Sequence, residues 1–182
     1  MLRDAEIAQF LAEAKPITRA QIHRLLTPRE PRRRGARKDR RASVVCRGAS
    51  GNKFVAFTRW YRENEFNPHD FSVGLLYVPP GGKGIILLRC NGWHGPHTNR
   101  LEKSAQSKNS KIPANTFHVH RITERYQEEK RVENYAEATD EFFSFASALH
   151  YMIDAFGFVV SDDPFGTGSQ HPLFPSGSHD RN

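Results

Sequence analysis

Two short histidine motifs are the part of this chain whose residue types and spacing suit chemistry. His94 and His97 lie in the run Cys-Asn-Gly-Trp-His-Gly-Pro-His-Thr-Asn, where glycine and proline fix a tight backbone path. His118 and His120 are separated by one residue, so on a strand both imidazoles point to the same face, about 6.5–7 Å apart along it. If the strand that carries the second motif lies beside the strand that ends at Cys90, the four imidazoles converge on one site.

The first chemistry that fits is metal-free acid–base cleavage of a phosphodiester. A pair of histidines takes and gives protons near neutral pH. Arg121, with Arg125 or Lys103 as alternatives, would stabilise the charge on the pentacoordinate phosphorus. RNA is the expected substrate because its 2′-hydroxyl is a built-in nucleophile, and no cofactor is expected. The candidate catalytic residues are His94, His97, His118, His120 and Arg121.

A second chemistry is metal binding, because neutral imidazoles suit zinc and similar divalent cations. The His-x2-His and His-x-His motifs would supply three or four ligands, from His94, His97, His118 and His120. No acidic residue is interleaved with these motifs, and none of the common zinc spacings is present. A divalent metal such as zinc, bound at His94, His97, His118 and His120, is therefore the alternative interpretation.

A third interpretation gives the histidines a structural role or places them on a polar binding surface without catalysis. Histidines at strand ends often donate hydrogen bonds to backbone carbonyls and shape a loop. Glu124 is a candidate to orient a histidine, as a carboxylate does for a catalytic imidazole, and Tyr126 is a candidate to stack on a base. The alternative for both is a solvated turn.

Most of the net charge of +7 comes from one segment. Residues 28–41 contain eight basic and two acidic residues, so the rest of the chain is nearly neutral. Such a segment can hold phosphates by releasing counterions, or it can be an extended, solvated linker. Its candidate nucleic-acid-binding residues are Arg32, Arg33, Arg34, Arg37, Lys38, Arg40 and Arg41.

The elements that must position these residues follow from hydrophobic periodicity. Strands are predicted at 43–47, 53–60, 71–78, 84–90 and 116–122, a short helix at 4–14, a second one capped by Thr18, and a long helix at 138–156. The predicted fold is therefore α+β: an antiparallel sheet of about five strands, with a C-terminal helix packed on one face and a short helical N-terminal arm. The predicted organisation is a helical N-terminal arm at 1–27, an Arg-rich linker at 28–42, an α+β core domain at 43–158 and a disordered tail at 159–182.

The run from Asn91 to His97, followed about 20 residues later by His118 and His120, resembles a family of uncharacterised prokaryotic proteins. These proteins have an NGxHGxH loop followed by an HxH strand, and the resemblance spans residues 54–156. It implies a bacterial or mobile-element origin. The family has no established activity, so no residue role is carried over from it.

Two functions remain open. The first is a nucleic-acid-associated protein, such as a small ribonuclease-like or toxin-type phosphodiester-cleaving enzyme, with RNA a better candidate than DNA. The second is a non-catalytic inhibitor or adaptor that binds a nucleoprotein complex, as in phage or mobile-element counter-defence of the anti-CRISPR type. The oligomeric state is open.

A cytoplasmic protein without a membrane segment is expected. No run approaches the ~20 apolar residues that span a bilayer. Charged residues interrupt the N-terminal stretch where a signal peptide would have its apolar core. Two cysteines, Cys46 and Cys90, make no disulfide framework and are expected to be reduced.

Overall fold

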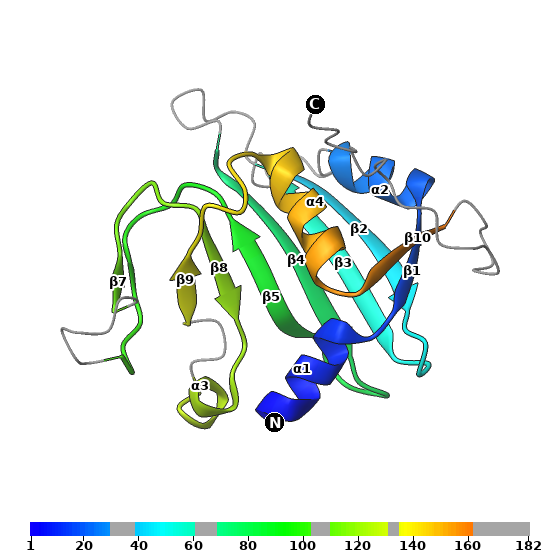
Figure 1. The fold of residues 1–182 in the computed structure, drawn as a ribbon, viewed down its shortest axis with the longest axis horizontal. Coiled ribbons are helices and arrows are strands. Elements are labelled where there is room, and N and C mark those ends of the chain that lie inside the picture. The colour runs from blue at the N-terminus through cyan, green and yellow to red at the C-terminus, as the bar shows by residue number, and fades with distance from the viewer. Residues whose placement is uncertain (30–38, 61–68, 103–109, 131–134, 162–182) are drawn as a thin grey trace, which may run out of the picture.

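An antiparallel sheet of six strands forms the centre of the computed structural model, which describes residues 1–29, 39–60, 69–102, 110–130 and 135–161. Figure 1 shows the sheet with helices in front of it, which confirms the α+β class. The strand order is β2-β3-β4-β5-β8-β9. The strands are β2 (Arg40–Arg47), β3 (Lys53–Trp60), β4 (Phe71–Val78), β5 (Ile85–Asn91), β8 (His118–Arg121) and β9 (Ala136–Ala138).

The predicted count of about five strands is wrong by one, because β9 was missed. β9 has three residues, with a glutamate between two alanines. Neither alternation nor β-branched side chains mark such a segment in a sequence. It forms because its backbone completes the edge of β8, with Ala136 opposite His120 and Ala138 opposite His118.

The two faces of the sheet differ in chemistry because side chains alternate along each strand. One face carries buried apolar side chains such as Phe54, Ala56, Val73, Leu88 and Val119. The helix α4 (Phe145–Ala155) packs on this face over β4 and β5, and α2 (Arg19–Leu26) packs beside β2. Leu149 and Met152 of α4 are fully buried in the same core.

The long helix is shorter than the periodicity predicted. It was expected from residue 138, but α4 begins after Ser144, whose side chain accepts a hydrogen bond from the backbone N–H of Ser147. The apolar residue Phe142 extended the predicted helical stripe, yet it is buried from the connection between β9 and α4. Because Phe142 fits the apolar pattern of the helix, the predicted start of the helix lies too early in the chain. The predicted cap of α2 by Thr18 is confirmed.

The N-terminal segment joins the core through a parallel pair of short strands. After α1 (Asp4–Ala12), β1 (Lys15–Thr18) pairs with β10 (Phe158–Ser161). The buried amine of Lys15 donates hydrogen bonds to the carbonyl oxygens of Leu11, Glu13 and Phe156 at 2.7–3.1 Å. β10 takes up the first residues of the predicted tail, and residues 162–182 lie outside the described part of the chain.

Three smaller elements complete the described structure. β6 (His97–Thr98) and β7 (Lys111–Ile112) form a two-residue antiparallel pair, and α3 (Glu124–Glu128) follows β8. Cys46 and Cys90 are buried and form no disulfide. Among the residues described, no helix has the length and apolar character needed to cross a membrane.

Candidate functional site

Strand pairing brings the two histidine motifs together. β5 and β8 are antiparallel neighbours, with Asn91 opposite His118 and Arg89 opposite His120. The adjacency assumed from the sequence is therefore confirmed. His94 follows β5 by three residues, and His97 begins β6, so the loop returns over the end of β8.

The four imidazoles form one cluster of rings. The ring centroids of His97 and His120 are 4.8 Å apart, and those of His118 and His120 are 5.0 Å apart. His118 also lies 5.9 Å from His94 and 6.2 Å from His97. His118 and His120 are buried, whereas His94 and His97 are partly exposed. The loop histidines are therefore the pair that a solvent-borne ligand meets first.

These rings line a pocket of about 480 Å³. Arginines and a carboxylate share the pocket with them: Arg59 from β3, Arg89 from β5 and Asp70, which precedes β4. A pocket that combines neutral or protonated imidazoles with two guanidinium groups suits an anionic ligand. Its size accommodates a nucleotide-sized group.

The register of the sheet explains why these residues meet. Residues directly opposite each other in antiparallel strands point to the same face. One such row crosses four strands, from Arg59 through Ser72 and Asn91 to His118. The next row on that face ends in Arg89 and His120. We call this face, opposite α4, the polar face.

Asp70 is the acidic neighbour of His94. The Nδ1 atom of His94 lies 3.3 Å from Oδ1 of Asp70, a charge contact without hydrogen-bond geometry, because this buried oxygen has no hydrogen-bond partner in the described part of the chain. Burial, together with the charges of Arg89 and Arg59, lowers the pKa of His94 below its ordinary value of 6.5. Burial also raises the pKa of Asp70, although the charge of Arg59 opposes this change. The lowered pKa favours the neutral ring of His94, and Nδ1 is the ring nitrogen that lies near the Asp70 carboxylate.

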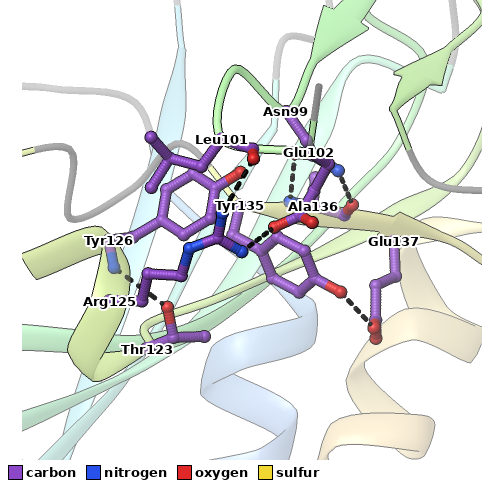
Figure 2. Close-up of polar contacts among 9 residues, drawn as sticks. All are labelled: Asn99, Leu101, Glu102, Thr123, Arg125, Tyr126, Tyr135, Ala136 and Glu137. Carbon is purple, nitrogen blue, oxygen red and sulfur yellow. Dashed lines mark hydrogen bonds and ion pairs between the residues drawn. The ribbon is translucent and has the colours of Figure 1, made fainter. Parts of the chain in front are cut away.

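Asn99 fixes His97 in a similar way. The side chain of Asn99 pairs with the backbone of β9, since its Nδ2 donates to the carbonyl of Ala136 and its Oδ1 accepts the Ala136 N–H (Figure 2). This pairing sets which end of the amide is the oxygen. The same oxygen lies 3.1 Å from Nε2 of His97, so Nε2 carries a proton.

The segment after Asn99 is tied to α3. Arg125 donates hydrogen bonds to the Glu102 carboxylate at 3.0 Å and to the Leu101 carbonyl at 2.8 Å, as Figure 2 shows. Tyr126 is buried beside Tyr135, with 5.3 Å between ring centroids, so it offers no ring face to a base. Both residues thus support the loop that carries His97 rather than reach the pocket.

His118 is held between two polar groups. Its Nδ1 lies 2.7 Å from the carbonyl oxygen of Thr116, and its Nε2 lies 3.4 Å from Nδ2 of Asn91. Burial, which outweighs the hydrogen bond to Thr116, lowers the pKa of His118 to about 4, and the neighbouring His94, His97 and Arg89 add to this effect. His118 is therefore a neutral, fixed wall of the pocket at pH 7.

The structure places Arg121 away from the histidines. It follows His120 on β8, so its side chain points to the helix-covered face, where its guanidinium lies 5.5 Å from the Phe156 ring and its Nε lies 3.7 Å from Glu137. Glu124 likewise pairs with Asp4 of α1 and orients no histidine. Lys103 lies outside the described residues.

Of the predicted nucleic-acid-binding residues, Arg40 and Arg41 belong to β2. Arg41 is exposed on the polar face, opposite Arg59, and Arg40 points to the other face. The remaining candidates lie outside the described residues: Arg32, Arg33, Arg34, Arg37 and Lys38.

The four histidines remain a candidate metal site by residue type alone. Within the described ranges, no group of three or more histidine, cysteine, aspartate or glutamate side chains is arranged to hold a metal ion. The Nδ1 of His94 lies near Asp70, and the Nε2 of His97 lies near Asn99. Both nitrogens of His118 have polar neighbours, Thr116 and Asn91.

Sequence reasoning missed Asp70, Arg59 and Arg89. Asp70 precedes a strand in an ordinary turn, and Arg59 and Arg89 read as single polar interruptions of apolar strands. Arg89 did offer a signal. A strand that is buried on both faces carries no charge, so the arginine in the apolar run 85–90 indicates that one face of this strand is polar. Comparisons of the chain with models of protein families, with curated proteins and with solved structures gave no match.

Proposed function

We propose that the polar face binds RNA and cleaves its phosphodiester backbone by metal-free acid–base catalysis. The observation that carries the proposal is the pocket in which His94, with Asp70 at 3.3 Å, lies with His97, Arg59 and Arg89. This set supplies a base, a second proton carrier and positive charge around one small volume.

His94 is the general base. Its Nε2 is the basic nitrogen in this proposal, because Nδ1 lies next to the Asp70 carboxylate. Removing the proton from a ribose 2′-hydroxyl leaves His94 as a cation, which the Asp70 carboxylate stabilises across 3.3 Å. Asp70 thus does what was expected of Glu124.

His97 is the general acid. Both ring nitrogens of a protonated histidine are donors, so in this proposal Nε2–H stays bonded to Asn99 and Nδ1–H donates to the leaving group. The attacking 2′-oxygen forms a bond to phosphorus, the bond to the 5′-oxygen breaks, and His97 donates a proton to that oxygen. The products are a 2′,3′-cyclic phosphate and a 5′-hydroxyl, with the proton from the 2′-hydroxyl left on His94.

Arg59 and Arg89 take the role expected of Arg121. Both line the pocket from the polar face, in rows that contain Ser72, Asn91, His118 and His120. Guanidinium groups present paired donors to phosphate oxygens, and a positioned charge is most effective where negative charge develops in the transition state.

The test is cleavage of a labelled single-stranded RNA in the presence of EDTA, with analysis of the product ends. We expect cyclic phosphate ends and cleavage by wild type that is unchanged by the chelator. His94→Ala and His97→Ala are expected to lose about 10²–10⁴-fold in rate. Asp70→Asn is expected to lose less, because it weakens orientation and charge but leaves the base.

His150→Ala is the matched control, since His150 is an exposed histidine of α4 on the other side of the sheet. It is expected to cleave like wild type. Intact RNA in every reaction would overturn the proposal and favour the non-catalytic inhibitor or adaptor. Cleavage that EDTA abolishes and zinc restores would overturn the metal-free mechanism in favour of a metal held by the histidines.

A further inference from the structure

A second, larger hollow adjoins the histidine pocket on the polar face. Its volume is about 950 Å³, and it shares Arg59, Ser72 and Arg89 with the histidine pocket. Its wall is basic and includes the Phe57 ring among five arginines: Arg24, Arg29, Arg41, Phe57, Arg59 and Arg89. We call this hollow, defined by these six residues, the arginine trough.

The trough runs across the strands rather than along them. Arg41 of β2 lies opposite Arg59 of β3, which heads the row that ends in His118 of β8. Four strand spacings of about 4.8 Å separate Arg41 from His118, or roughly 19 Å. Arg24 and Arg29 extend the basic wall beyond the edge of β2, where Arg29 pairs with the backbone of Arg41. A ligand that fills both hollows therefore spans several nucleotides.

A buried carboxylate holds two of the arginines in place. Oδ2 of Asp39 accepts hydrogen bonds from Nε of Arg41 at 2.7 Å and from Nε of Arg59 at 2.6 Å. The Asp39 side chain is 1% exposed, so it is not itself a contact for a ligand. Bonds at Nε fix the direction of each guanidinium plane. The trio keeps a net positive charge.

Phe57 lies in the middle of this basic surface. It occupies the row between Ser43 of β2 and Gly74 of β4. A Cβ atom built at Gly74 would overlap the Phe57 ring, so the absence of a side chain there lets the ring lie over β4. The ring is partly exposed and lines the trough among arginines. Basic grooves interrupted by aromatic rings are typical of single-stranded nucleic acid binding, where bases stack on the rings.

We infer that the arginine trough binds a single-stranded RNA segment next to the scissile phosphate, with phosphates on the arginines and one base stacked on Phe57. The inference rests on the proposed function for the choice of RNA. A duplex keeps its bases stacked on each other, so it presents phosphates but no free base face to Phe57. The trough therefore binds unpaired RNA in preference to a duplex. RNA bound there continues into the adjoining pocket that contains His94.

The test is binding of a fluorescein-labelled 2′-O-methyl oligoribonucleotide, followed by anisotropy over a range of salt concentrations. This probe lacks the 2′-hydroxyl, so it binds without being cleaved. Arg41→Gln is expected to weaken binding and to reduce the slope of log Kd against log salt by about 0.7. Phe57→Leu is expected to weaken binding about tenfold at every salt concentration, because stacking is lost and no charge changes.

Arg47→Gln is the matched control for charge. Arg47 is an exposed arginine of β2 on the same face as Arg41, but it does not line the trough. It is expected to bind with wild-type affinity. Thermal unfolding of each variant separates lost contacts from lost folding.

Tighter binding of the single strand than of the same sequence as a duplex, with the Arg41 and Phe57 effects, supports the inference. Equal binding of duplex and single strand, or wild-type affinity in folded Arg41→Gln and Phe57→Leu, would overturn it. Normal binding without cleavage of unmodified RNA would remove the proposed catalysis but leave the trough. Cleavage of unmodified RNA, together with wild-type binding by Arg41→Gln and Phe57→Leu, would remove the proposed trough but leave the proposed catalysis.

Discussion

Asn99 pairs with Ala136 through both ends of its side-chain amide, at 2.6 Å to the carbonyl oxygen and 2.9 Å from the N–H. The amide group of Asn99 thereby makes the two hydrogen bonds to Ala136 that the backbone of a neighbouring strand would make at the edge of β9 (Figure 2). Because the same Oδ1 lies 3.1 Å from His97, the position of the proposed acid depends on the missed sixth strand.

Asn99→Ala is expected to lower kcat about 10–100-fold with a smaller change in KM, because His97 loses its orienting partner while the arginines still hold substrate. Steady-state cleavage measures both constants. Asn99→Asp keeps an acceptor toward His97 and the Ala136 N–H, so it is expected to restore part of kcat. Thr98→Ala, at the exposed neighbouring position, is the control. A rise in the KM of Asn99→Ala as large as the expected fall in kcat, with kcat itself unchanged, would contradict a positioning role.

The acid limb of the cleavage profile is expected below pH 6.5. The base must be neutral, and burial with the charges of Arg89 and Arg59 lowers the pKa of His94. Activity therefore falls only when the pH drops below that lowered pKa. Arg89→Gln removes one of the charges, so it is expected to move the acid limb to higher pH and to lower the plateau. The measurement is kcat/KM from pH 4.5 to 8. An unmoved limb in Arg89→Gln would exclude His94 as the titrating base.

Protein stability is expected to fall as the pH drops from 6.5 toward 4. The pKa of His118 is lowered to about 4 in the folded protein, whereas the unfolded chain has the ordinary value near 6.5. Between these values the unfolded chain binds more protons, so the free energy of unfolding rises with pH. The contribution of His118 to the free energy of unfolding is fully present above pH 6.5 and amounts to at most about 3 kcal/mol.

Urea unfolding at several pH values measures this dependence. His118→Asn replaces the titrating ring by an amide that can still donate to the Thr116 carbonyl, and it is expected to flatten the dependence between pH 6.5 and 4.5. The difference between the two proteins isolates His118 from the carboxylates that also titrate there. Parallel curves for both proteins would mean that the pKa of His118 is not lowered in the folded protein.

Two glycines of the histidine loop are expected to respond differently to alanine. A Cβ atom at Gly92 would overlap the His69 carbonyl oxygen, which accepts a hydrogen bond from Trp93, so the backbone cannot yield without losing that pairing. A Cβ atom at Gly95 meets no atom within 4 Å. Gly92→Ala is expected to lose about 1–3 kcal/mol of stability and most cleavage, because the path to His94 shifts.

Gly95→Ala is the matched control for that substitution, in the same loop three residues away. It is expected to keep wild-type stability and cleavage. Chemical denaturation and the RNA cleavage rate together check both variants. Equal stability of the two variants would show that the close approach of Gly92 to His69 carries no structural constraint.

The sequence by itself determined the histidine motifs, the α+β class and most strand positions. Alternation in β3, the glycine-rich turn before β5 and the capping residue of α2 are local signals, read from neighbours a few residues apart. His118 and His120 share a face for the same local reason, because side chains alternate along any strand.

Only the tertiary structure decided which residues accompany the histidines. Arg121 was grouped with them because it is adjacent in sequence, yet alternation turns it to the other face toward Phe156. Arg59 and Arg89 join the site through the register of four strands, and Asp70 joins it because it directly precedes β4. Register is set by long-range backbone pairing and by burial of the opposite face, and neither leaves a local pattern around the residues it aligns.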